Sequence, residues 1–384
     1  MMDYSKVQSR KQMAVQPLAI EEYFSIGPDV ISLGIGEPDF HTPEKAGFAA
    51  IAAIVNGATT YPPSMGLLEL RRALSDYMGH SFNFDYAPDE ILITVGGSLA
   101  IDSVMRAFVE EGDEVILPTP TFPSYFPAIE MAGGRVVEVP TQLSNGWALQ
   151  PEDLRAAITE RTKLLVLTSP NNPTGACLSA ENMAALADVL RDTNVLVMSD
   201  EIYAELTYND QHASILDQPD MRERTILVSG FSKMYAMTGW RVGYVCAPAE
   251  LLRPIAKCHS FAVMCAPGIA QYAALEGLKS CKDNVRIMVE EYRHRRDFVQ
   301  ERLCQLGWQC SLPGGAFYAF PCIRGTGLDS ATFCRRLRDE GKVAMVPGTG
   351  FGQCGEGYVR ISYAYHMDAL KAAFDRIDAF CARL

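Results

Sequence analysis

Between about residues 90 and 247, short apolar runs alternate with segments of helical periodicity. This alternation constrains the fold more than any other feature of the chain. The runs are nearly continuous in hydrophobic residues, as in strands that are buried on both faces of a parallel sheet covered by helices. They read EILITVG, EVILPTP, RVVEVPT, KLLVLTS, VLVMSDE, TILVSG and VGYVCAP. We therefore expect an α/β fold, with a mostly parallel seven-stranded sheet sandwiched by helices.

The pattern changes after Pro267, where longer helical segments flank three short apolar stretches, GGAFYAF, KVAMVPG and GYVRISYA. This predicts a smaller α+β domain, with which the N-terminal segment packs. A chain of 384 residues is long enough for two packed units. We therefore predict an N-terminal arm and small-domain segment over 1–40, a large domain over 41–280 and a small C-terminal domain over 281–384. The helices expected from the periodicity span about 99–110, 125–132, 282–306 and 367–384.

Polar motifs begin where three of the apolar runs end. They are SPNNPTG at 169–175, SDEIY at 199–203 and SGFSK at 229–233. In open α/β sheets, ligands bind outside the carboxyl ends of the strands. The three motifs are therefore predicted to meet at one edge of the sheet and to form a ligand site there.

Two charged residues of these motifs have both an ordinary and a catalytic interpretation. A lone lysine is usually a solvated surface charge, whereas a buried lysine such as Lys233 could form a Schiff base with a carbonyl. Asp200 could be a helix cap, or it could pair with a protonated pyridine nitrogen and keep that ring cationic. The residues around Lys233 and Asp200 are needed to choose between the ordinary and the catalytic interpretation.

Other residues near the strand ends are weaker candidates on their own. Asn172 lies in a segment that would be a turn in any fold, but its amide could hold a phenolic oxygen. VGGSLA, at 95–100, joins a strand to a helix, so its backbone N–H groups could bind an anion. Phe122 could be a core residue or could lie flat on a ligand ring.

Taken in order, SPNNPTG, SDEIY and SGFSKMYAMTGWRVGY resemble the class I, fold type I aminotransferases that use pyridoxal phosphate, most closely the aromatic-amino-acid and aspartate subgroup. The spacing matches too, with 33 residues from Asp200 to Lys233 and eight from Lys233 to Arg241. LGIGEPDFHTP, YPPSMGLLELR, GGAFYAFP and GYVRISYA extend the likeness from about residue 30 to 365. Single motifs would be moderately specific, but the ordered set is highly specific.

The resemblance implies how the cofactor would be held. Lys233 would bind it covalently and would later move protons between substrate and cofactor, while Asp200 would pair with the ring nitrogen. Asn172 and Tyr203 would bind the ring hydroxyl, and Phe122 would stack on the ring. The phosphate would be held by Arg241, Ser232 and the backbone of Gly97, Ser98 and Leu99. The chain departs from several relatives at Gly230, where they carry a phosphate-contacting serine.

The resemblance also implies a dimer and a substrate site. Tyr61 would reach the phosphate in the neighbouring subunit, so the active unit would be a homodimer. Arg360 would clamp the substrate α-carboxylate, with Asn172 beside it and Gly36 closing over it. An arginine suits these oxyanions because its planar fork donates two parallel hydrogen bonds. The implied reaction exchanges an amino group between an L-amino acid and a 2-oxo acid such as 2-oxoglutarate, in two half-reactions.

The preferred amino acid is less clearly indicated. Some aspartate-specific relatives carry a lysine where this chain has Ser98, and others use an arginine in the segment matching roughly 255–270. No arginine occurs between Arg253 and Arg286. A buried carboxylate without a partner is costly, so an aromatic or broad specificity is expected. The alternative on the same scaffold is a pyridoxal-phosphate-dependent carbon–sulfur β-lyase.

Composition excludes several other classes of protein. The net charge of −12 argues against nucleic-acid binding, and the six histidines lack metal-ligand spacing. Eleven cysteines, an odd number without a CxxC pair, favour a reducing compartment. The longest apolar run, FAAIAAIV, is too short to span a bilayer, and no secretory signal is visible. We therefore expect a cytoplasmic enzyme without a metal, a membrane partner or a nucleic-acid partner.

Two other functions are weaker alternatives. A cofactor-binding regulator would need a DNA-binding segment, for which there is no room before ISLGIGEPDF. A nicotinamide enzyme would need a GxGxxG motif, which the sequence lacks.

Overall fold

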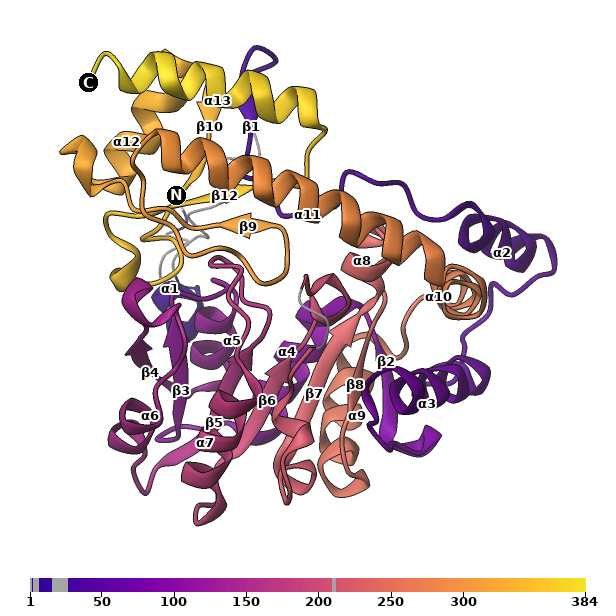
Figure 1. Ribbon diagram of the computed structural model, residues 1–384. Coiled ribbons are helices and arrows are strands. Elements are labelled where there is room, and N and C mark those ends of the chain that lie inside the picture. Colours follow the sequence, from indigo (N-terminus) through magenta and orange to yellow (C-terminus); the bar gives the residue numbers. More distant parts are fainter. Residues whose placement is uncertain (1, 3–6, 16–26, 209–211) are drawn as a thin grey trace.

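The computed structural model describes residues 2, 7–15, 27–208 and 212–384. Its largest element is a seven-stranded sheet, with helices on both faces and a smaller α+β part above one end of the strands (Figure 1). In spatial order, the strands are β2 (Ile91–Thr94), β8 (Gly243–Cys246), β7 (Thr225–Gly230), β6 (Leu196–Asp200), β5 (Thr162–Thr168), β3 (Glu114–Thr119) and β4 (Arg135–Pro140).

The predicted mostly parallel sheet is confirmed. β4, β3, β5, β6 and β7 pair in parallel, while β8 is antiparallel to both of its neighbours, β7 and β2. Thr168 of β5 lies opposite Asp200 of β6, and Asp200 lies opposite Val228 of β7. The carboxyl ends of these three strands are therefore level, which brings the motifs that follow them to the same edge of the sheet.

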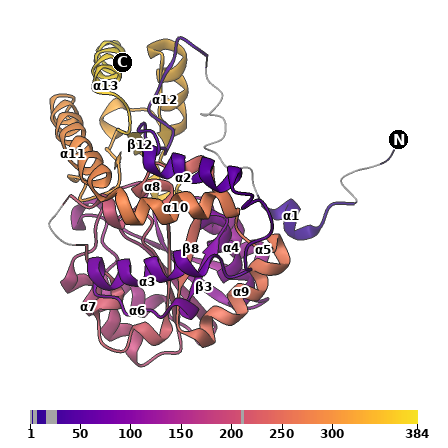
Figure 2. The same cartoon turned by 90° about the vertical axis from the view of Figure 1, so that its right-hand side faces the viewer.

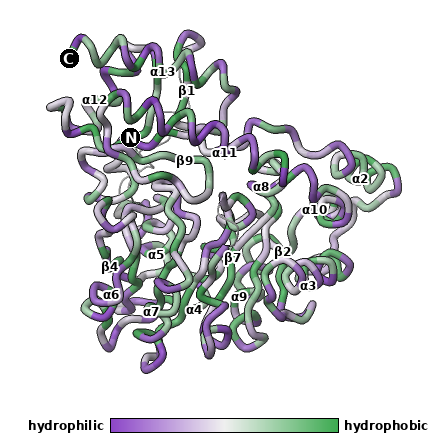
Figure 3. The backbone as a smooth tube through the Cα atoms, in the orientation of Figure 1, coloured by the Kyte–Doolittle hydropathy of each residue, from purple (hydrophilic) through white to green (hydrophobic). Residues whose placement is uncertain are grey.

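Helices cover both faces of the sheet, because neighbouring strand residues point to opposite sides. Leu164 and Val166 pack toward one face, whereas Leu165 and Leu167 pack toward the other. The first face is covered by α4 (Gly96–Phe108), α5 (Tyr125–Ala132) and α9 (Ala249–Val263). The second face is covered by α3 (Leu68–Phe82), α6 (Pro151–Ala157), α7 (Ala180–Arg191) and α10 (Gly268–Ser280). Figure 3 shows the strands mainly in hydrophobic colours.

The smaller part combines the C-terminal residues with a piece of the N-terminal segment, as predicted. β1 (Ile31–Ser32) pairs in parallel with β10 (Val343–Ala344), and Leu33 is buried in the same core as Val343 and Ile361. The other elements are β9 (Tyr318–Ala319), β11 (Val346–Pro347), β12 (Val359–Ser362), α11 (Lys282–Gln305), α12 (Ser330–Arg336), α13 (Met367–Cys381) and the π-helix Leu337–Gly341. The domain boundaries near 40 and 280 stay a prediction, and residues 1, 3–6 and 16–26 of the predicted N-terminal segment lie outside the described ranges.

The remaining helices are short or lie at the edge of the molecule. α2 (Glu44–Val55) packs beside α10, and the two lie together in both views (Figures 1 and 2). The short helices are α1 (Arg10–Ala14) and α8 (Phe231–Met234). There are also 3₁₀ turns, which include Ala204–Leu206 and Thr238–Trp240. No helix in the described ranges is both long enough and apolar enough to span a membrane.

The predicted helix boundaries were close to those observed. The helix expected at 125–132 has these bounds, and those expected to end at 306 and 384 end at Gln305 and Cys381. The helix expected from Leu99 starts at Gly96 and ends at Phe108. Glycine is a poor helix former, so the sequence did not indicate that Gly96 and Gly97 form the first turn.

Candidate active site

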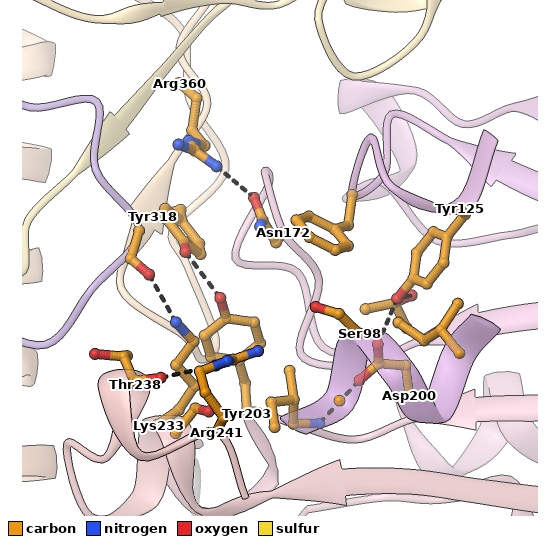
Figure 4. Close-up of a pocket in the computed structure, with 17 residues that line it drawn as sticks. Ser98, Tyr125, Asn172, Asp200, Tyr203, Lys233, Thr238, Arg241, Tyr318 and Arg360 are labelled. Carbon is orange, nitrogen blue, oxygen red and sulfur yellow. Dashed lines mark hydrogen bonds between the residues drawn. The ribbon is translucent and has the colours of Figure 1, made fainter. Parts of the chain in front are cut away.

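A cavity of about 250 Å³ lies at the carboxyl edge of the sheet, beneath the smaller part (Figure 4). It is lined by residues of the three strand-end motifs, of α4, of β9, of β12 and of the N-terminal segment. Eleven of the thirteen residues selected from the sequence line it: Gly36, Gly97, Ser98, Phe122, Asn172, Asp200, Tyr203, Ser232, Lys233, Arg241 and Arg360. The other two, Tyr61 and Leu99, do not.

Lys233 projects into this cavity from α8, directly after β7. Its Nζ donates a hydrogen bond of 2.7 Å to the carbonyl oxygen of Gly36. Burial lowers the pKa of Lys233 to about 8, a shift that the carboxylate of Glu37 opposes and the positive charge of Arg360 increases. The interpretation of Lys233 as a solvated surface charge is therefore wrong. Near neutral pH, a useful fraction of this amine is unprotonated and nucleophilic.

Asp200 ends β6 and is 5% exposed. Its Oδ2 accepts a hydrogen bond of 2.6 Å from the hydroxyl of Tyr125, the first residue of α5. Its Oδ1 accepts a bond of 3.1 Å from the backbone N–H of Ile202, so the carboxylate also stabilises the local turn. Burial raises the pKa of Asp200 to about 6, although the two hydrogen bonds act in the opposite direction. A buried carboxylate of this kind is stabilised by a cationic group beside it.

Arg241 and the first turn of α4 form a site for an anion. The backbone of Arg241 has a φ of 55°, in the left-handed region, and its Nη1 donates 2.7 Å to the carbonyl of Thr238. Its guanidinium lies so close to Gly96 that a Cβ there would be 2.5 Å from Nη2. Gly97 and Ser98 follow in the same turn, where backbone N–H groups have no partner within the helix. A helix N-terminus beside an arginine favours a phosphate group.

The glycine at position 230 has a structural explanation. Gly230 of β7 pairs with Gly243 of β8. A Cβ at position 230 would lie 2.9 Å from the Cα of Gly243 and 3.2 Å from the carbonyl oxygen of Val242. The two backbones therefore approach too closely for a serine to fit without movement, and Ser232 is the hydroxyl residue of this loop that lines the cavity.

Arg360 enters the cavity from β12, on the side of the smaller part. It is 2% exposed, and burial lowers the pKa of its guanidinium. Nη1 donates 2.9 Å to Oδ1 of Asn172, and Nη2 donates to the carbonyl of Gly34. Its Nε is buried without a hydrogen-bond partner. No carboxylate pairs with this arginine in the described ranges, so it is suited to bind an anionic ligand.

Six residues line the cavity that the sequence did not single out. They are Ile101, Tyr125, Thr168, Ile202, Thr238 and Tyr318. Tyr318 belongs to the GGAFYAFP stretch, and Tyr125 lies three residues after Phe122. Their contacts with Tyr203 and Asp200 depend on the packing of β9 and α5 against the strand ends, which residue spacing does not indicate.

Tyr61 is 80% exposed and lies outside the cavity of its own chain. Its predicted contact with a neighbouring subunit stays a prediction. Leu99 is in the first turn of α4, one residue beyond Ser98, and only its backbone was expected to take part. No group of three or more His, Cys, Asp or Glu residues within the described ranges could hold a metal ion.

A buried lysine, a buried aspartate and an anion site at the strand ends of this sheet define a pyridoxal-phosphate enzyme of fold type I. Residues 28–377 match the family described as aminotransferase class I and II. The chain belongs to this family, and pyridoxal phosphate is its cofactor.

Three relatives with known names or structures show how close the similarity is. A probable N-acetyl-LL-diaminopimelate aminotransferase of Bacillus subtilis is 45% identical and covers 92% of this chain and 89% of its own. An aspartate aminotransferase of Pyrococcus abyssi is 43% identical over 95% of each chain. The crystal structure of an aromatic aminotransferase from Pyrococcus horikoshii OT3 is 41% identical, with a TM-score of 0.91 over 96% of this chain and 99% of that chain.

The residues of the cavity fit this cofactor. The cofactor carries an aldehyde, a basic ring nitrogen, a ring hydroxyl and a phosphate. The cavity offers an amine with a lowered pKa in Lys233 and a buried carboxylate in Asp200. It also offers hydroxyl and amide groups in Tyr203 and Asn172, and an arginine beside a helix N-terminus. Each group of the cofactor therefore has a chemically suitable partner.

Proposed function

We propose that this aminotransferase exchanges the amino group of an L-amino acid, aromatic or of broad range, with a 2-oxo acid such as 2-oxoglutarate, by a ping-pong mechanism. The observation that carries the proposal is the arrangement of Lys233 and Arg360. Both cations face one cavity, and their nearest polar contacts are the backbone carbonyls of Gly36 and Gly34 and the amide of Asn172. The amine of Lys233 is suited to react with a carbonyl carbon, and the guanidinium of Arg360 is suited to bind a carboxylate.

Lys233 is the proposed nucleophile and proton carrier. When bound, pyridoxal phosphate supplies an aldehyde carbon that accepts an amino group and a ring that withdraws electrons from the substrate α-carbon. Lys233 Nζ would hold the cofactor covalently, and the same amine, once free, would take and return the proton of the substrate α-carbon. An amine with a pKa of about 8 is suited to both tasks near neutral pH.

Four other residues are proposed to orient the cofactor ring directly, and Tyr125 acts through one of them. Asp200 holds the ring nitrogen in its protonated form, and Tyr125 fixes the direction of that carboxylate. Tyr203 donates its hydroxyl hydrogen to the ring oxygen, because burial keeps the pKa of this phenol well above its ordinary value. Asn172 contributes its side-chain amide to the same oxygen. Phe122, edge-on to Tyr125 at 5.7 Å, covers one side of the ring site.

The phosphate is proposed to bind the first turn of α4. Arg241 supplies the charge, and the backbone N–H groups of Gly97, Ser98 and Leu99 supply hydrogen bonds. Ser232 of α8 would add a hydroxyl. The α-carboxylate of the substrate is proposed to bind Arg360, with Asn172 and Gly36 beside it.

The charges of the cavity support a substrate with an uncharged side chain. Three cationic side chains line it, Lys233, Arg241 and Arg360, with one carboxylate, Asp200. The proposed phosphate contact uses Arg241, and the proposed α-carboxylate contact uses Arg360. Among the residues that line the cavity, no further arginine or lysine is left for a distal carboxylate, and the position occupied by lysine in some aspartate-specific relatives is Ser98. The distal carboxylate of 2-oxoglutarate would therefore be neutralised by a group from outside this lining. The names of the three relatives, which range from aspartate to aromatic and acylated substrates, are compatible with this proposal.

We propose that the enzyme works as a homodimer, in which Tyr61 completes the phosphate site of the neighbouring subunit. Apolar side chains are exposed on α2, at the end of α9 and on α10, close to Tyr61 in sequence or in packing. Phe261 is 85% exposed and Val55 is 79% exposed, and large exposed apolar side chains of this kind are typical of an interface. The others are Phe48, Ile51, Ile54, Val263, Met264 and Tyr272.

The cytoplasm is the proposed location of the enzyme. The cysteines of the described ranges are present as thiols, and Cys246 and Cys281 are among the buried ones. Thiols persist in a reducing compartment.

The test is a panel of L-amino acids incubated with 2-oxoglutarate, with formation of each 2-oxo acid as the readout. We expect L-phenylalanine or L-tyrosine among the best donors, and glutamate as the second product. A parallel reaction with L-cystathionine and no acceptor detects the lyase alternative through pyruvate and ammonia. Turnover of L-aspartate alone would contradict the aromatic assignment, and pyruvate formation without an acceptor as the main activity would contradict transamination.

A further inference from the structure

Tyr318 contacts three groups of the site at once, although the sequence did not single it out. Its hydroxyl lies 2.8 Å from the hydroxyl of Tyr203. The guanidinium carbon of Arg360 lies 4.7 Å from the centre of its ring. Its hydroxyl also lies so close to Gly36 that a Cβ there would be 2.3 Å away. The side chain is 1% exposed, so these contacts are fixed by packing (Figure 4).

The donor in the hydrogen bond between the hydroxyls of Tyr318 and Tyr203 is defined once Tyr203 donates its own hydrogen elsewhere. A phenol has one hydrogen to donate and can accept through its oxygen. If Tyr203 donates its hydrogen to the cofactor ring oxygen, then Tyr318 must donate to Tyr203. Burial raises the pKa of both phenols, so both stay protonated and can donate. A donor that itself accepts a hydrogen bond is a stronger donor, because successive bonds polarise one another.

The ring contact restrains Arg360 through a second aromatic residue. The ring of Phe351 lies 4.8 Å from the same guanidinium carbon, so Arg360 has an aromatic ring at close range in both Tyr318 and Phe351. Rings near a buried guanidinium stabilise its charge and limit its rotation. Its Nη1 is directed to Asn172, which lies on the loop after β5.

We propose that Tyr318 is a positioning residue for both the cofactor site and the substrate site. Its hydroxyl orients Tyr203, and its ring orients Arg360. The inference rests on the proposed roles of Tyr203 and Arg360, and it does not depend on which side chain the substrate carries. It predicts that the two functions separate in different variants, since phenylalanine keeps the ring and loses the hydroxyl, whereas leucine loses both.

The test uses the holoenzyme and two readouts that require no turnover. The first is the pH at which the visible absorption of the lysine-bound cofactor changes. We expect Tyr318→Phe to raise this pH by about 0.5 to 1 unit, because a weaker Tyr203 donor stabilises the ring oxygen anion less. The control is Tyr292→Phe, which removes a buried hydroxyl that has no hydrogen-bond partner among the described residues and lines no part of the cavity, and which should leave the transition unchanged.

The second readout is the dissociation constant of propionate, a carboxylate with no amino group and no distal side chain. We expect Tyr318→Phe to bind it within about twofold of the wild-type enzyme, and Tyr318→Leu and Phe351→Leu to bind it roughly tenfold more weakly. Comparison of propionate with 3-phenylpropionate on the wild-type enzyme tests the aromatic specificity separately. A failure of the proposed aromatic specificity is therefore distinguishable from a failure of the positioning role of Tyr318.

Two results would overturn the inference. An absorption transition in Tyr318→Phe that coincides with that of the wild-type enzyme would show that the hydroxyl does not act through Tyr203. Equal propionate affinities in Tyr318→Phe and Tyr318→Leu would show that the ring does not position Arg360.

Discussion

The hydroxyl of Tyr125 donates a hydrogen bond of 2.6 Å to Oδ2 of Asp200 and lies 3.0 Å from the hydroxyl of Thr168. The bond joins the first residue of α5 to the last residue of β6, across the end of the sheet. Asp200 has no positively charged side-chain partner in the described ranges, so this bond and the N–H of Ile202 are the contacts that favour its ionised form. The orientation of Asp200 and its charge therefore depend on Tyr125.

Tyr125→Phe should make cofactor binding more sensitive to acid. The hydrogen bond lowers the pKa of Asp200, so its loss should raise that pKa above its value of about 6. Cofactor affinity, measured by absorbance titration of the apoenzyme between pH 5 and 8, should then fall away about one pH unit higher than in the wild-type enzyme. Tyr292→Phe, which lies outside the cavity, serves as the control. An unaltered pH profile in Tyr125→Phe would show that the bond does not control this carboxylate.

Lys233 should react with the cofactor at a lower pH than an ordinary lysine. The unprotonated amine is the nucleophile, and burial lowers the pKa of Lys233 to about 8 from 10.5. The rate of covalent attachment to the apoenzyme should therefore rise with pH and level off above about pH 8. Stopped-flow absorbance measures this rate directly. A rate that keeps rising toward pH 10 would mean that the amine is as exposed as a surface lysine.

Glu37→Gln should move the same profile to lower pH. The carboxylate of Glu37 raises the pKa of Lys233, whereas burial, Arg360 and Arg241 lower it. Neutralising Glu37 should therefore lower the pKa of Lys233 further. The matched control is Glu110→Gln, an exposed acid in the segment after α4 that lines no part of the cavity. A shift of the same size in both variants would attribute the effect to net charge instead of to Glu37.

Arg360→Lys should weaken substrate binding although it keeps the positive charge. A lysine cannot donate two parallel hydrogen bonds, and the aromatic rings of Tyr318 and Phe351 suit a planar guanidinium. We expect the KM for the amino acid to rise about ten- to a hundredfold, with cofactor binding retained. Arg324→Lys makes the same exchange at an arginine that lies over Tyr358, away from the cavity, and should leave KM unchanged.

Mixed dimers test whether Tyr61 serves the neighbouring subunit. Tyr61→Ala should lower activity at limiting cofactor concentration, and Lys233→Ala should abolish it. In a hybrid of these two variants, one site would have the intact Lys233 of its own chain and the intact Tyr61 of the other, so activity should be regained after mixing. The control pair, Lys233→Ala with Arg360→Ala, changes two residues of the same cavity and should not recover. Absence of recovery in the first pair would contradict a shared site.

The sequence predicted the sheet and most of the site because these depend on local patterns. Buried parallel strands are recognisable as apolar runs, and the motifs after β5, β6 and β7 mark the level ends of the strands. The resemblance to the aminotransferases implied the roles of the other site residues, and eleven of the thirteen residues selected from the sequence line one cavity. The expected alternative of a helix cap at Asp200 was wrong, because the carboxylate accepts a bond from the N–H of Ile202 and the next helical turn has Tyr203 as its N-cap.

The residues that were missed depend on contacts between segments that are distant in the chain. Tyr125 reaches Asp200 from 75 positions away, and Tyr318 reaches Tyr203 from 115 positions away. Both are tyrosines among many buried aromatic residues, and nothing in their spacing distinguishes them from core residues. The close pairing of Gly230 with Gly243, which excludes a serine, likewise became visible only from the antiparallel register of β8.

The central claim is that the cofactor is linked covalently to Lys233, and borohydride reduction of the holoenzyme followed by peptide mass mapping tests it most directly. The reduced link is stable, so the modified lysine can be located in the digest. We predict a single pyridoxyl group on the peptide that contains Lys233, and no such group in the folded Lys233→Ala protein. A label on another lysine, or an unlabelled Lys233 in protein that retains full activity, would contradict the account.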